Sequence, residues 1–205
     1  MLLTTRRTAA LALCFVANLC LAQAVAPPAA SVRVRGTVQS VAPGLLTVKD
    51  RGGEVLQLVL PDALPVSEVY PLAMGDIQPG SFIGTAAMPQ ADGSERAIAV
   101  MVFPESARGV GEGHRPFDLL PQSTMTNATV ADVVTATNGR TLQLKYKDGA
   151  RAIVVPPDAP IVSFRPGDRS LLVPGASVSL TAQMVGDKPT ISRISAGRNG
   201  FVLPY

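Results

Sequence analysis

The chain carries the same order of segments twice, displaced by about 95 residues. Each copy opens with a long segment rich in β-branched residues, followed by a Gly turn, a short hairpin and the tripeptide Pro-Asp-Ala, at 61–63 and 157–159. A Pro-Gly pair then precedes another strand-like segment, at 79–80 and 174–175. Because matching turn residues at a nearly constant offset are typical of duplicated units, the sequence predicts two copies of one fold.

The segments between these turns are short and suit strands. The chain has 18 Gly and 18 Pro, all beyond residue 24, so most segments are interrupted before an ordinary helix could form. Leu142, Leu144 and Tyr146 alternate with polar residues, a period of two that indicates a strand with one buried face. Only 122–138 is long enough for a helix, and its place in the repeat favours a strand. The sequence therefore predicts an all-β protein.

The predicted architecture is two small five-stranded barrels in tandem, of the OB-like or SH3-like kind. Five strands in about 70 residues, with a Gly-marked first turn and a long loop before the fourth strand, are typical of such barrels. We expect barrel repeat 1 at 32–103, a linker at 104–125, barrel repeat 2 at 126–196 and a tail at 197–205. The alternative is a single β-sandwich built from the strands of both copies.

The first 24 residues are typical of a cleaved signal peptide. Arg6 and Arg7 precede an apolar stretch, and Ala22-Gln23-Ala24 forms the small-x-small pattern that signal peptidase cuts. We expect a flexible segment at 25–31 to begin the mature chain. This predicts a periplasmic or secreted protein that does not span the membrane after cleavage.

Three other interpretations of the N-terminus remain open. An uncleaved membrane anchor would need an apolar stretch of about 20 residues, longer than the one present. Lipid attachment at Cys20 would need a small residue before the cysteine, whereas the preceding Ala17-Asn18-Leu19 puts a large residue there. The two arginines could also direct twin-arginine export. If residues 1–24 are removed, Cys14 and Cys20 are lost with them, and the exported protein has no thiol.

Charge and aromatic content argue against a nucleic-acid partner. The formal net charge of +3 includes Arg6 and Arg7, so the exported protein is nearly neutral. Barrels that bind single strands stack bases on aromatic side chains, whereas the predicted hairpins carry mainly Leu and Val, with Tyr146 as their only aromatic residue.

In its order of strand, Gly turn, hairpin, Pro-Asp-Ala loop, Pro-Gly turn and strand, the chain from 32 to 196 resembles a small bacterial OB-like domain of unknown function found in exported proteins. The segment 112–130 is similar to uncharacterised proteobacterial proteins that often carry an automatic "metal ABC transporter permease" label. A permease needs several membrane spans, and no apolar run after residue 24 is long enough for one. The resemblance brings no established activity and no catalytic residues.

The linker holds the residues most suited to chemistry. His114 is the only histidine of the chain, and Glu105, Glu112 and Asp118 lie near it in sequence. Imidazole with carboxylates suits Zn²⁺ or Mn²⁺, and imidazole with the thioethers of nearby methionines would suit copper. The alternative is a linker in which these side chains are solvated or hydrogen-bonded. The four residues are therefore the candidate metal ligands.

Other motifs of the linker indicate no enzyme. Gly109-Val110-Gly111-Glu112-Gly113 lacks the Lys-Ser/Thr of a phosphate-binding P-loop. A Ser-His-Asp arrangement could be built only from Ser123, His114 and Asp118, which lie close in sequence without any defined geometry. The sequence therefore predicts a non-catalytic binding or scaffold protein of the bacterial cell envelope without a cofactor, its partner an envelope protein or a small ligand. The alternative is a periplasmic metal-binding accessory protein that uses the linker.

Overall fold

The computed structural model describes residues 31–136 and 139–205, and its described part consists of strands, turns and three short 3-10 helices. The predicted all-β fold is confirmed, and the run that could have formed a helix is a strand. The predicted signal peptide lies outside the described residues. In chain order the elements are β1 (Ser31–Ala42), β2 (Leu45–Asp50), β3 (Val55–Val59), β4 (Val66–Pro71), η1 (Met74–Asp76), β5 (Phe82–Pro89), β6 (Glu95–Val102), η2 (Glu105–Ala107), β7 (Gly113–Pro116), β8 (Thr124–Ala136), β9 (Gly139–Tyr146), β10 (Gly149–Val155), β11 (Ile161–Pro166), η3 (Arg169–Leu171), β12 (Ser177–Val185) and β13 (Lys188–Gly197). No helix in these two ranges is long and apolar enough to cross a membrane.

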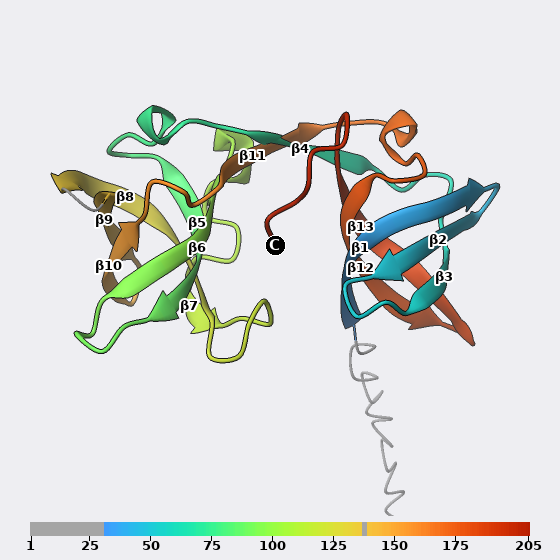
Figure 1. Ribbon diagram of the computed structural model, residues 1–205, viewed down its shortest axis with the longest axis horizontal. Coiled ribbons are helices and arrows are strands. Elements are labelled where there is room, and N and C mark those ends of the chain that lie inside the picture. Colours follow the sequence, from blue (N-terminus) through green and yellow to red (C-terminus); the bar gives the residue numbers. More distant parts are fainter. Residues whose placement is uncertain (1–30, 137–138) are drawn as a thin grey trace, which may run out of the picture.

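The strands form two lobes, each a closed circuit of hydrogen-bonded neighbours (Figure 1). The first lobe runs β3-β2-β1-β12-β13, and Thr190 of β13 pairs with Val59 of β3 to close it. The second lobe runs β10-β9-β8-β5-β6, and Ile153 of β10 pairs with Glu95 of β6 to close it. The short strand β7 adds to the second lobe by pairing with β8.

Each lobe combines strands from both repeats. The first three strands of repeat 1 form one lobe with the last two strands of repeat 2, joined by the pair β1–β12. The first three strands of repeat 2 form the other lobe with the last two strands of repeat 1, joined by the pair β8–β5. This differs from the expected arrangement, in which 32–103 and 126–196 would each close on themselves. A physical reason lies at the crossing point, where Pro65 and Pro71 bound β4. Proline favours extended backbone before it, so the chain continues into the other lobe instead of folding back.

The two Pro-Gly turns predicted from the repeat make the same contacts in opposite lobes. The backbone N–H of Gly80 donates to the carbonyl of Val130 at 2.8 Å, and that of Gly175 donates to the carbonyl of Val38 at 2.9 Å. Both glycines have a left-handed φ, 88° and 89°, a conformation that other residues rarely adopt. Each turn therefore contacts the first strand of the other repeat.

Strands β4 and β11 connect the lobes, and Figure 1 shows them crossing the space between the two lobes side by side. They pair antiparallel, with Val69 opposite Phe164. Buried Glu68 of β4 accepts hydrogen bonds from Arg198 at 3.0 Å and from Arg165 at 2.8 Å. These hydrogen bonds lower the pKa of Glu68 to about 2. The connection is therefore held by charge-assisted hydrogen bonds as well as by its strand pairs.

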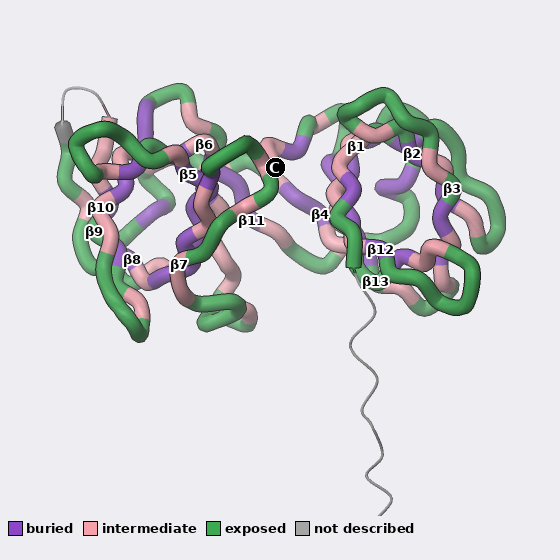
Figure 2. The backbone as a smooth tube through the Cα atoms, turned by 90° about the horizontal axis from the view of Figure 1, so that it is seen from below, coloured by how far each residue is buried: buried purple, intermediate pink, exposed green. Residues whose placement is uncertain are grey.

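Each lobe has its own apolar core, and a third, smaller cluster lies at the connecting strands (Figure 2). Leu46 and Leu142 are fully buried in the first and second lobes, respectively. The third cluster joins Val69, Val162 and Leu203, so the last residues of the chain pack against β4 and β11.

The segment 104–125 is more ordered than the expected linker. Gly113–Pro116 forms β7 and pairs with β8 in register, with His114 opposite Thr126. Added to the edge of a sheet, the segment gains backbone hydrogen bonds that a solvated linker would lack.

Candidate functional site

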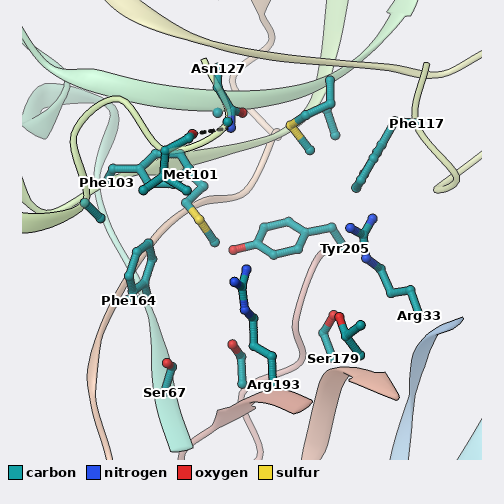
Figure 3. Close-up of a pocket in the computed structure, with 18 of the residues that line it drawn as sticks. Arg33, Ser67, Met101, Phe103, Phe117, Asn127, Phe164, Ser179, Arg193 and Tyr205 are labelled. Carbon is teal, nitrogen blue, oxygen red and sulfur yellow. Dashed lines mark hydrogen bonds between the residues drawn. The ribbon is translucent and has the colours of Figure 1, made fainter. Parts of the chain in front are cut away.

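A cavity of about 640 Å³ lies between the two lobes, beside the connecting strands (Figure 3). Strands of both lobes line it: β1, β12 and β13 from the first, and β5, β6 and β8 from the second. This volume lies within the range of about 300–1,000 Å³ that is common for small-molecule sites. Because neither lobe could form it alone, the site depends on how the chain joins its two repeats.

The wall from the first lobe is made of arginines and hydroxyl groups. Strand register places its residues in two rows, since residues opposite one another and two apart along a strand share one face. One row crosses β1, β12 and β13, and the other continues into β4. The rows are Arg33–Thr181–Arg193 and Arg35–Ser179–Ser195–Ser67.

The wall from the second lobe is mainly apolar. It also consists of two rows, across β8, β5 and β6, and the ring of Phe103 lies beside it, 5.7 Å from the ring of Phe164 and edge-on to it. The rows are Met125–Ala86–Ala99 and Asn127–Gly84–Met101. The cavity thus has one polar and one apolar wall.

Three side-chain atoms around this cavity are buried without a hydrogen-bond partner: Arg35 Nε, Asn127 Oδ1 and Tyr205 Oη. The Asn127 side chain is held from one side only, because its amide N–H donates to the carbonyl of Val110 at 2.9 Å. Burial raises the pKa of the Tyr205 phenol, so its hydroxyl stays protonated. Leaving such atoms unpaired costs about 1–3 kcal/mol each.

Gly84 makes room for Asn127. A Cβ atom at this position would lie 2.8 Å from Asn127 Oδ1 and 3.0 Å from the ring of Phe103. Both distances are too short for ordinary contacts, so a larger residue would displace the amide from the cavity wall. The Asn127 amide can therefore lie at this wall only because residue 84 has no side chain.

One edge of the cavity is closed by a contact between the lobes. Asp118, in the loop after β7, pairs with Arg33 at 2.9 Å and with Arg35 at 2.6 Å. The neighbouring Phe117 ring lies under both guanidinium groups, at 5.1 and 5.4 Å. Because this Asp118 carboxylate is half-exposed, each ion pair contributes little stability, but together they position the two arginines.

The end of the chain enters the cavity from the connecting strands. The backbone N–H of Leu203 donates to Ser177 Oγ at 3.1 Å, and Arg51 donates to the carbonyl of Leu203 at 3.0 Å. These contacts place the Tyr205 ring between the two walls, where Figure 3 shows it near Met101 and Arg193.

The four candidate metal ligands are not brought together. Asp118 binds the arginines of β1, Glu105 pairs with Arg108 at 2.6 Å, and Glu112 accepts from the backbone N–H of Lys147 at 3.1 Å. His114 contacts different residues again. Within 31–136 and 139–205, no three His, Cys, Asp or Glu side chains are grouped as ligands for an ion.

His114 is one-fifth exposed and is held by its neighbours in the second lobe. Its Nδ1 lies 2.9 Å from Thr126 Oγ1, and its Nε2 lies 3.7 Å from the buried carboxylate of Glu95. Burial lowers the pKa of His114, and Arg151 and Arg115 lower it further against the opposite effect of Glu95. His114 is therefore hydrogen-bonded, one of the two states expected for a linker side chain, but it stands in a strand and not in a solvated linker.

Most cavity residues could not be identified from the sequence. Arg193, Asn127 and Tyr205 lie in separate segments, and only strand register and the path of the tail bring them to one place. One signal was present, because Arg33 and Arg35 alternate with valines and so had to share a face of their strand. Comparisons with protein-family models, with curated proteins and with solved structures find no match to this chain.

Proposed function

We propose that this protein is a non-catalytic binding protein of the bacterial cell envelope, and that its ligand is a small molecule held between the two lobes. The observation that carries the proposal is that three residues lining one cavity, Arg35, Asn127 and Tyr205, each have a buried polar side-chain atom without a hydrogen-bond partner. A ligand that hydrogen-bonds to them would remove their desolvation cost, which makes its binding favourable.

The residue types around the cavity support binding. Guanidinium, hydroxyl and amide groups orient a ligand, and apolar side chains hold its remaining surface. The envelope location rests on the signal-like pattern of residues 1–24. The closed circuits of five strands support the description of each lobe as a small OB-like barrel that is built from strands of both repeats.

The test fills the cavity and asks whether a bound molecule is lost. Ser179 lies in the centre of the polar wall and is partly buried, so Ser179→Trp would place an indole where the ligand should be. Ser40→Trp is the matched control, because Ser40 is exposed on the same lobe and does not line the cavity. Circular dichroism would show that both variants fold.

Native mass spectrometry of protein purified from the envelope, without denaturation, provides the measurement. We expect a small-molecule adduct on the wild type and on Ser40→Trp, and none on Ser179→Trp. An adduct that persists on Ser179→Trp would place the ligand elsewhere, and wild-type protein without any adduct would count against the proposal.

A further inference from the structure

We propose that the ligand is an amphiphilic organic anion, with an acidic head group against the first lobe and a ring-containing apolar body against the second. This inference rests on the proposed function, because it assigns a chemical class to the ligand of that cavity.

The charge of the cavity favours an anion. Three arginines of the first lobe line it, at positions 33, 35 and 193, and Arg115 of β7 adds a fourth from the second lobe, where it donates to the carbonyl of Gly111. No acidic side chain of the described chain lines it. Asp118 neutralises part of the charge of Arg33 and Arg35 from outside. Among residues 31–136 and 139–205, neither Arg115 nor Arg193 has an acidic partner. Positive charge between low-dielectric walls attracts an anion, and guanidinium groups bind carboxylates with paired hydrogen bonds.

The place of the head group follows from Arg193. This side chain extends from β13 towards the centre of the cavity, beside the hydroxyl of Tyr205 (Figure 3). The unpaired Arg35 Nε belongs to the same wall, two strands away. Two guanidinium groups and a protonated phenol can all donate hydrogen bonds to a carboxylate, and none of them carries a negative charge that would repel it.

The place of the body follows from the opposite wall. Met101, Met125 and Phe103 line it, and Phe164 adds a second ring. Thioether and aromatic groups pack well against rings, because they are polarisable and present flat surfaces. An aliphatic or aromatic ring system fits this wall better than a second charged group, which would lose its hydration there.

The unpaired Asn127 Oδ1 adds a further requirement. It lies on the apolar wall and can only accept a hydrogen bond, since the N–H side of the amide is held by Val110. The ligand should therefore carry a hydroxyl or other donor on its body, at the end remote from the acid.

A matched series of rigid compounds tests these three requirements. The probe is 6-hydroxy-2-naphthoate, which has an acid and a hydroxyl at opposite ends of a ring system. Its partners are the neutral 6-hydroxy-2-naphthamide, which lacks the charge, and 2-naphthoate, which lacks the hydroxyl. Calorimetry on the full mature protein would measure the affinity of each.

We expect the hydroxynaphthoate to bind at least about tenfold more tightly than the amide, and more tightly than 2-naphthoate, because only it satisfies both walls. Arg193→Gln should remove most of the preference for the acid over the amide. Arg96→Gln is the control, because Arg96 is equally a surface arginine of a strand but lies outside the cavity. It should leave all three affinities unchanged.

The outcomes separate the two proposals. Equal binding of acid and amide, unaffected by Arg193→Gln but lost in Ser179→Trp, would overturn the anionic ligand and leave the cavity as a binding site. Binding of the acid that survives Ser179→Trp would overturn both. Failure of all three compounds to bind would overturn the ligand class, while the adduct experiment still decides the proposed function.

Discussion

The two lobes have the same frame and opposite chemistry where they face each other. Their strand pairs show the same irregularities at corresponding places: β1 and β2 shift register after Val38, and β8 and β9 shift after Val130. At the cavity, however, positions related by the repeat differ in kind. Arg33, Thr181 and Arg193 of the first lobe stand where the second has Met125, Ala86 and Ala99. The comparison teaches that the two lobes share one frame of strands, and that the side chains on one face of each sheet give the two walls of the cavity their different chemistry.

A second difference lies outside the cavity. The second lobe carries the additional strand β7, which brings His114 beside Glu95. The first lobe has no histidine in its described residues. The two lobes therefore differ by an added strand at an edge as well as by the side chains on the outer faces that meet at the cavity.

The exchange of strands between repeats can be broken by cross-linking. Ser31 of β1 lies opposite Gln183 of β12, and directly opposed strand residues are close enough for a disulfide. In a background with Cys14 and Cys20 replaced by serine, we expect Ser31→Cys/Gln183→Cys to oxidise almost completely. The position that corresponds to Gln183 in repeat 1 is Met88, and Ser31→Cys/Met88→Cys should stay reduced. Non-reducing electrophoresis distinguishes the two, and the reverse result would show that each repeat closes on itself.

The equivalence of the two lobes can be tested in their cores. Leu46 and Leu142 occupy corresponding positions and are fully buried, so replacing either with alanine should lower the free energy of unfolding by about 2–5 kcal/mol. Since every lobe contains strands of both repeats, we expect one cooperative transition in each variant. Denaturant melts followed by circular dichroism give both quantities. Leu120→Ala, at an exposed position, should change stability by less than about 0.5 kcal/mol. Two separate transitions, only one of them shifted, would contradict the shared frame.

The sequence predicts the frame much better than the site. Turn residues such as Gly80 and Gly175 act through local backbone geometry, and both adopt the conformation that glycine favours. The exchange between repeats could not be predicted, because β5 and β12 are similar strands and β1 could form the same backbone hydrogen bonds with either of them. The cavity could not be predicted either, since Arg193 and Asn127 meet only after the lobes are placed. The short strand that contains His114 was missed because a Gly-rich neighbourhood suggests a loop, whereas Gly113–Pro116 pairs with β8.

The smallest expected effect concerns the histidine that only the second lobe carries. The pKa of His114 is lowered in the folded protein, mainly by burial, so the folded state disfavours its protonated form. Stability should therefore be fully present above the unfolded pKa of about 6.5 and should fall as the pH drops below it. His114→Gln can keep a hydrogen bond to Thr126 and cannot titrate, so its stability should change less between pH 7 and pH 5.

Denaturant melts of wild type and His114→Gln at several pH values measure this effect. It should be small, because the side chain is one-fifth exposed and solvent screens its charge. The sign is the informative part. If the wild type instead gains stability relative to His114→Gln as the pH falls, then pairing of protonated His114 with Glu95 outweighs burial, and the added strand β7 holds an ion pair that strengthens in acid. If the two profiles coincide, His114 is as solvated as a linker residue, and β7 does not hold it against the lobe.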